Sequence, residues 1–250
     1  MIRNLLLAAV ACVALAPAAL AADITSALAD PGRPAADVAR DAARKPEAIV
    51  AFSGLEAGDR VIDFIPGGGY FTRIFSGMVG PKGHVYAMVP GAAATLEAPL
   101  TATITPFAAS HPNVTVVITR GLDFTAPGGP VDVFWTAQNY HDLYNPISKG
   151  APAPTSMLPL NKLVFAALKP GGTYIIIDHV APAGSGVSDT STLHRIEPAR
   201  VRADVEAAGF VFVGESNVLR NPSDPHDKIV FDSSIRGHTD QFVFKFRKPG

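Results

Sequence analysis

Two regular patterns of apolar and polar positions alternate along most of the chain. The apolar runs, rich in Val and Ile, lie at 60–65, 83–89, 114–120, 131–137 and 168–179. The amphipathic stretches lie at 70–79, near 92–109 and at about 154–168. Such apolar runs are typical of strands buried on both faces, and their alternation with helices predicts a parallel sheet covered on both sides.

The two ends of the chain depart from this alternation. The segment 35–55 predicts two short helices, the second beginning at Pro46 and ending at Gly54. Near the other end, a helix predicted at 197–210 is followed by two apolar runs, 210–219 and 240–248, with no helical stretch between them. These runs predict an antiparallel pair that closes a doubly wound, Rossmann-like α/β sheet of seven strands, mostly parallel.

The first 21 residues have the order of a secretory signal peptide. One early cation, Arg3, precedes a short apolar stretch, Pro17 interrupts it, and a small-x-small site ends at Ala21. The stretch is short for a membrane span, so we expect cleavage and a periplasmic or secreted protein. We expect residues 22–45 to form a helical extension and 46–250 to form one domain. The single cysteine, Cys12, lies in the signal peptide, so no disulfide is expected afterwards.

Composition narrows the range of partners. The chain is 48% hydrophobic and 17% charged, which favours a folded core over disorder. Without Arg3 it carries 20 basic against 22 acidic residues, a formal charge of -2, and it has no block of lysines and arginines. Nucleic acid is therefore not an expected partner, and neither is a membrane after cleavage. A small molecule is the expected partner.

A glycine-rich bend follows the first apolar run. Pro66 and the glycines at 67–69 lead directly into the helix predicted from Tyr70. Glycines let backbone amides approach a ligand closely, and the start of a helix favours negative groups. An ordinary turn would have the same composition, but the order of strand, glycines and helix favours a ligand loop.

The bend also resembles a known motif. Asp63, Gly67 and Gly69 match motif I of class I S-adenosylmethionine-dependent methyltransferases, in which an acidic residue is followed by three alternate glycines, and Ile65 stands at the first glycine position. The LKPGG and AAGF turns and the antiparallel end continue the resemblance from about Glu47 onward. The segments NYHDL, IIIDH and LHRIEP are similar to a bacterial group of predicted methyltransferases with a signal peptide.

This resemblance implies S-adenosylmethionine as cofactor and methyl transfer to an unidentified small-molecule acceptor. It places eight residues around the cofactor: Asp63, Pro66, Gly67, Gly68, Gly69, Tyr70, Asp123 and Asn139. For Asp123, a turn-capping role is the alternative. Where the superfamily usually has an acid for the ribose, after the second strand, this chain has Met88, Val89 and Pro90, and Glu97 is the nearest replacement.

The loop after the fourth apolar run is the best place for a catalytic group, since ligands sit at the carboxyl ends of strands in such sheets. His141 would remove a proton from the acceptor, with Asp142 orienting it and His179 assisting. The alternative is a polar loop in which His141 only bonds the backbone.

Two further groups have competing interpretations. Asp178 and His179, with His141, Asp142 and His194, could bind a divalent metal, but no tight ligand spacing supports this, and we expect no metal there. Arg195 either holds an acidic acceptor or pairs with Glu197.

Three functions therefore stand at this stage. The first is methyl transfer, and the second is a non-catalytic periplasmic protein that binds a small ligand in the same cleft. The missing ribose acid and the predicted export favour this second reading. The third is a metal-assisted hydrolase using the His and Asp residues.

Overall fold

The structure, a computed structural model, describes residues 23–91, 94–146 and 150–250, so the predicted signal peptide lies outside it. The strands are β1 (Arg60–Phe64), β2 (His84–Gly91), β3 (Val114–Arg120), β4 (Val131–Ala137), β5 (Leu168–His179), β6 (Val211–Ser216) and β7 (Gln241–Arg247). The α-helices are α1 (Ile24–Leu28), α2 (Ala35–Val38), α3 (Asp41–Arg44), α4 (Pro46–Ser53), α5 (Tyr70–Val79), α6 (Ala94–Ser110), α7 (Leu158–Ala167) and α8 (Pro198–Ala207). Three single-turn helices are η1 (Gly80–Lys82), η2 (His141–Tyr144) and η3 (Asn217–Leu219).

All seven strands form one sheet in the order β3-β2-β1-β4-β5-β7-β6. The first five are parallel, and β7 lies between β5 and β6, antiparallel to both. The predicted seven-stranded, mostly parallel sheet with an antiparallel end is thus confirmed. Because the strand order reverses between β1 and β4, the connections leaving these two strands diverge to opposite faces of the sheet.

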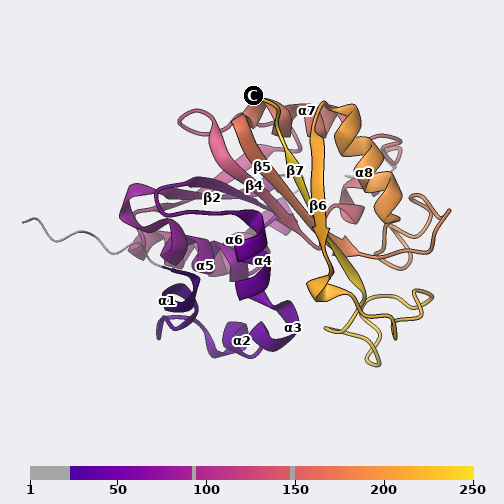
Figure 1. Cartoon of the computed structure of the whole chain (residues 1–250), viewed down its shortest axis with the longest axis horizontal. Coiled ribbons are helices and arrows are strands. Elements are labelled where there is room, and N and C mark those ends of the chain that lie inside the picture. Colours follow the sequence, from indigo (N-terminus) through magenta and orange to yellow (C-terminus); the bar gives the residue numbers. More distant parts are fainter. Residues whose placement is uncertain (1–22, 92–93, 147–149) are drawn as a thin grey trace, which may run out of the picture.

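Both faces of the sheet are buried, as the unbroken apolar runs predicted. On one face Trp135 packs against Phe71 and Phe75 of α5, with ring centroids 4.8 and 4.9 Å apart. On the other face its neighbour Phe134 packs against Phe64 and Tyr174, in the cluster that α7 and α8 cover. Figure 1 shows α4 and α5 on one side of the strands and α7 and α8 on the other. No helix in the described ranges has the length and apolarity to cross a membrane.

The N-terminal extension, in which α1, α2 and α3 lie, folds over the start of α5, and we call it the N-terminal cover. Sequence patterning predicted two helices in segment 35–55, and the second, α4, begins at Pro46 as predicted, behind the left-handed Lys45 (φ 47°). The first is divided into α2 and α3 by a turn at residues 39–40. Helix α1 lies so close to α5 that a Cβ at Gly77 would come within 2.9 Å of the Ala27 Cβ. Only glycine allows this approach.

Ion pairs hold the extension in place. Asp37 accepts a hydrogen bond of 2.7 Å from Arg73 Nε on α5. Asp41 accepts one of 2.7 Å from Arg33 and one of 2.6 Å from the Tyr70 hydroxyl. Helices α2 and α3 are therefore tied to the same end of α5 that follows the glycine bend.

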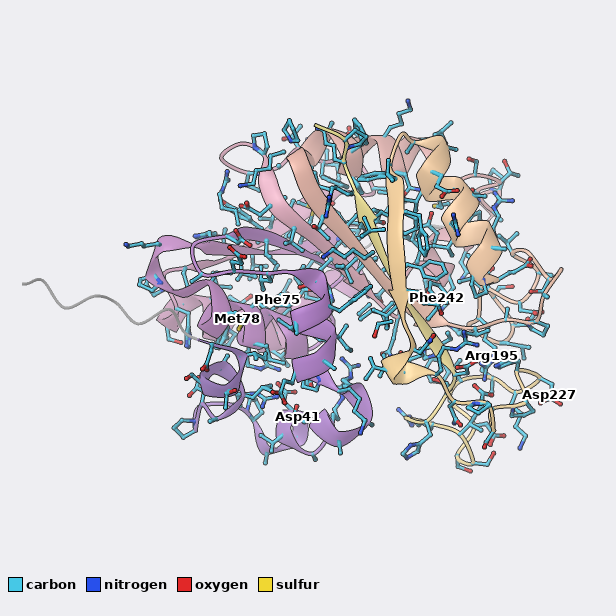
Figure 2. All side chains as sticks on the ribbon, in the orientation of Figure 1. Asp41, Phe75, Met78, Arg195, Asp227 and Phe242 are labelled. Carbon is cyan, nitrogen blue, oxygen red and sulfur yellow. The ribbon has the colours of Figure 1, made fainter. Side chains whose placement is uncertain are left out.

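A second cover, the C-terminal cover, is the long segment 220–240 that precedes β7. It is fastened by Arg195, whose guanidinium makes two 2.9 Å bonds to Asp224, and both side chains are fully buried. The expected pairing of Arg195 with Glu197 or with an acidic acceptor is therefore wrong, and Glu197 instead accepts hydrogen bonds from the amides of Gly184 and Gly186. Figure 2 shows Arg195 beside this yellow segment.

Replacing Arg195 should be among the most destabilising changes on this side of the molecule. Arg195→Met leaves the Asp224 carboxylate buried without its partner, so we expect a loss of about 3 to 5 kcal/mol in the free energy of unfolding, measured with urea. The matched control is Arg202→Met, since Arg202 forms an exposed pair with Glu206. This control should lose about 0.5 kcal/mol or less. Equal losses in the two variants would contradict the assignment.

Candidate functional site

A cavity of about 470 Å³ lies at the carboxyl ends of β4 and β5, between the two covers. Three arginines line it, Arg40, Arg44 and Arg236, together with the aromatic rings of Phe71 and Phe231. Among the described residues, no Asp or Glu lines the cavity. A concave site with cations and aromatic rings but no carboxylate favours an organic anion as its ligand.

Arg44 is the most constrained of these cations. Its Nη2 donates a 2.9 Å hydrogen bond to Oε1 of Gln138, and its guanidinium lies 4.7 Å from the centre of the Tyr70 ring. Burial, together with the neighbouring charge of Arg40, lowers the pKa of Arg44 to about 10, so it remains a cation at neutral pH. Gln138 in turn donates to Gln241 Oε1 at 3.1 Å, which joins the N-terminal cover to β4 and β7.

His179, at the end of β5, also lines the cavity. Its Nδ1 lies 2.8 Å from the hydroxyl of Thr239. Burial lowers the pKa of His179 to about 4, against the opposing charge of Asp178. The cavity therefore contains a neutral imidazole at physiological pH, which can accept a hydrogen bond but is a weak base.

His141 has a different environment. Its backbone amide and its Nδ1 both bond the carboxylate of Asp178, at 2.8 and 2.7 Å. Burial would lower the pKa of His141, but the charge of Asp178 and the hydrogen bonds to Asp142 and Asp178 outweigh it and raise this pKa to about 10. Asp178, rather than Asp142, orients the ring, and a ring cationic at neutral pH has no free lone pair for an acceptor proton. The catalytic role of His141 stays a prediction, which this charge opposes.

The glycine bend keeps the geometry of a ligand loop. Gly67 (φ 54°) and Gly69 (φ 81°) take left-handed conformations, and a Cβ added to Gly67 would meet no atom within 4 Å. In the ranges that the structure describes, the amides of Gly67 and Gly68 have no hydrogen-bond acceptor. Ile65 also has a positive φ, 57°, although it is β-branched. The backbone thus follows a glycine-like path at the first glycine position of the motif, at a cost of about 1 to 2 kcal/mol.

Asp63 and Asn139 lie beneath this bend. The Asp63 carboxylate accepts a 2.6 Å hydrogen bond from Thr72, and burial raises the pKa of Asp63 to about 6 despite that bond. The Asn139 amide donates to the carbonyls of Ile65 and Ala137, at 2.9 and 2.6 Å. It therefore joins the ends of β1 and β4 at the reversal of strand order.

Other predicted cofactor residues have different surroundings. The Tyr70 hydroxyl is turned to Asp41, and Asp123 is exposed in a turn after β3, bridged to Arg120. Pro66 is half-buried, and its carbonyl accepts a hydrogen bond from the Gly69 amide. At the end of β2, Met88 and Val89 are fully buried. The side chain of Glu97 is outside the described part of the chain.

Several residues of the site had not been singled out from the sequence. Arg40, Arg44, Arg236 and Thr239 come from segments far from the bend. In the sequence, the hint of a cation-lined site was the presence of arginines at positions 33, 40, 44 and 73. Their spacing did not show that two of them would line a cavity.

Comparisons with known proteins give relationships of fold only. No family model and no curated protein matches the chain. A methyltransferase of Aquifex aeolicus, described as S-adenosylmethionine-dependent, is similar at 18% identity and a TM-score of 0.57, over 84% of this chain and 98% of that one. A methyltransferase from Mesorhizobium loti, described in the same way, is similar at 16% identity and a TM-score of 0.54, over 82% of this chain and 97% of that one.

The chain has the class I methyltransferase fold. The cyclase SpnF is similar to the same degree, with 16% identity and a TM-score of 0.58 over 83% of this chain and 81% of that one. Because a cyclase shares the architecture, the fold by itself does not identify the reaction.

The charge of Asp63 should lower stability at neutral pH. With a pKa raised from 3.8 to about 6, the folded protein holds a proton that the unfolded chain releases, so stability falls as the pH rises between these values. Asp63→Asn removes this loss while keeping an acceptor for Thr72. We expect its stability advantage to grow from near zero below pH 4 to about 2 to 3 kcal/mol above pH 6 in urea unfolding. An advantage that does not change with pH would contradict the raised pKa.

Proposed function

We propose that this protein transfers a methyl group from S-adenosylmethionine to a small organic anion. The observation that carries the proposal is the open glycine bend after β1, at the same sheet edge as the cation-lined cavity at the ends of β4 and β5. A cofactor at the bend and an acceptor in the cavity would meet near the reversal of strand order, where ligands bind in open α/β sheets.

The residues at the bend fit the cofactor unevenly. The space beside Gly67 and the unpaired amides of Gly67 and Gly68 suit its amino-acid half, and the buried Asp63 provides a negative charge for its cationic groups. The ribose half lacks the usual acid, because Met88 and Val89 form the end of β2. We therefore expect binding through the bend, with lower affinity than a ribose-binding carboxylate would give.

When bound, S-adenosylmethionine supplies an electrophilic methyl group, and the chain's own part is mainly to position the acceptor. Arg44 and Arg40 would bind the acid group of the acceptor, while Phe71 and Phe231 contact its apolar part. The neutral imidazole of His179 would accept a hydrogen bond from the acceptor's reacting group and orient it. The two covers would keep water out of the cavity.

Export belongs to the same proposal. The signal peptide predicted at 1–21 would place the protein in the periplasm or outside the cell. A charged cofactor made in the cytoplasm is scarce there, and this supports a second candidate: a non-catalytic protein that binds a small anion in the same cavity. The missing carboxylate at the end of β2 also favours that candidate.

Binding of S-adenosylmethionine tests the first proposal directly. We expect calorimetric titration to detect both this cofactor and S-adenosylhomocysteine, and Gly67→Val to weaken both by about 10- to 100-fold, since a side chain there fills the space needed for contact with the backbone amides. The matched control is Gly171→Val, which also has a positive φ (79°) and open space around its Cβ but lies in the turn at the start of β5. Absence of binding by the unaltered protein, or equal loss in both variants, would overturn the methyltransferase proposal and favour the second candidate.

The class of acceptor can be tested without the cofactor. We expect small carboxylates such as benzoate to raise the melting temperature, and their uncharged amides to have little effect, because only the acids can pair with the arginines. Removing the charges of the two exposed arginines, Arg40→Gln and Arg236→Gln, should weaken acid binding about tenfold each. Exposed Arg120→Gln, outside the cavity, serves as the control. If amides bind as well as acids, the acceptor is not an anion.

A further inference from the structure

Beside the cavity, three side chains that do not line it direct donor atoms toward one point. His141 Nε2 lies 3.2 Å from His194 Nδ1 and 3.3 Å from Asp142 Oδ1. His194 Nδ1 lies 3.3 Å from the same Asp142 oxygen. The two imidazole nitrogens and the carboxylate oxygen thus form a nearly equilateral triangle.

The sides of this triangle match one coordination geometry well. Zinc binds imidazole nitrogen and carboxylate oxygen at about 2.0 to 2.2 Å in a tetrahedron, which separates any two donors by about 3.4 Å. An octahedral magnesium site would separate neighbouring donors by about 2.9 Å and prefers oxygen ligands. Two nitrogens and one oxygen at 3.2 to 3.3 Å therefore favour zinc or a zinc-like transition metal.

His141 is already oriented as a metal ligand. Asp178 is fully buried and accepts hydrogen bonds from both the amide and Nδ1 of His141. This arrangement directs Nε2 of His141 toward Asp142 and His194, where a bound metal ion would displace the proton of Nε2. A carboxylate behind a ligating histidine is the usual support of such a ring in metal sites, because it holds the ring's orientation and increases its basicity.

The other histidine is held by the fold as well. His194 has a left-handed backbone (φ 55°), which is costly for a residue other than glycine. It immediately precedes Arg195, whose buried pair with Asp224 fixes the segment. Its ring also packs against Phe231 of the cavity wall, with centroids 4.9 Å apart. The strained conformation is therefore maintained by its neighbours and presents Nδ1 to His141 and Asp142.

Charge and exposure agree with a bound dication. Asp142 and Asp178 supply two negative charges beside the two imidazoles. His141 is almost fully buried, whereas His194 and Asp142 are 27% and 44% exposed. A metal held by these three residues would thus have a fourth position on the exposed side, for water or a substrate atom. Three protein ligands with one open position are typical of catalytic zinc sites.

We propose that this protein binds one zinc-like divalent ion through Nε2 of His141, Nδ1 of His194 and the Asp142 carboxylate, with Asp178 as the support of His141. The proposal does not depend on methyl transfer, since none of these residues belongs to the glycine bend or lines the cavity. The sequence named these residues among possible metal ligands but did not favour a site, because residues 141 and 142 are far from residue 194 and form no recognisable spacing with it.

Metal analysis of the untagged, purified protein tests the proposal. After dialysis against zinc chloride and then metal-free buffer, we expect one equivalent of zinc per chain. His194→Ala and Asp142→Ala should each weaken zinc binding by about a hundredfold or more, and Asp178→Asn by about 10- to 100-fold. Cobalt in place of zinc should give the intense visible absorption of tetrahedral Co²⁺, and both alanine variants should lose it.

Two controls separate metal binding from folding. His111→Ala removes a histidine that stacks on Phe107, at the far end of α6, and should leave zinc binding unchanged. Melting curves in the presence of a chelator show whether each variant folds, and Asp142 is exposed enough that its replacement should not prevent folding. No stoichiometric zinc in the unaltered protein, or full binding in folded Asp142→Ala and His194→Ala, would overturn the proposal.

Discussion

The reversal of strand order between β1 and β4 is the constraint on which the rest of this molecule depends. Connections leaving the two strands diverge to opposite faces, so no element of the sheet fills the space between their carboxyl ends. Asn139 closes part of this gap by donating to the carbonyls of Ile65 and Ala137. The bend beyond Ile65 can therefore stay rigid while the space beside Gly67 remains open, which a ligand loop requires.

The site is completed by two covers that come from opposite ends of the chain. The N-terminal cover brings Arg40 and Arg44, and it is held to α5 by the Asp37–Arg73 ion pair and by the Tyr70–Asp41 hydrogen bond. The C-terminal cover brings Arg236 and Thr239, and it is held by the buried Arg195 pair. A buried ion pair adds little net stability but is costly to break, so it suits a segment that must keep one conformation. Each cover is thus held in one conformation by a buried ion pair.

Patterns of neighbouring residues predicted much of the fold, and long-range pairing explains what they missed. The strands were found because burial on both faces leaves unbroken apolar runs, as in 131–137, and the bend because glycines separate a strand from a helix. The cavity was not predicted, since its arginines meet only after the covers fold. Arg195 was paired with its neighbour Glu197, but the fold brings Asp224 to it from 29 residues away. The possible metal ligands His141, Asp142 and His194 were named but not favoured, because only the fold brings residue 194 beside residues 141 and 142.

The alternation of side chains along β5 explains why the two histidines differ. Successive residues of a strand point to opposite faces, so Asp178 and His179 face different layers. His179 follows Ile177 toward the cavity, where Thr239 is its partner, and it stays neutral. Asp178 follows Ile176 toward the other face, where it holds His141 among carboxylates. The imidazole of the cavity and the carboxylate that supports the proposed metal ligand His141 thus come from adjacent strand positions. The two sites are neighbours, since the rings of His141 and His179 lie 5.9 Å apart and the charge of His141 lowers the pKa of His179.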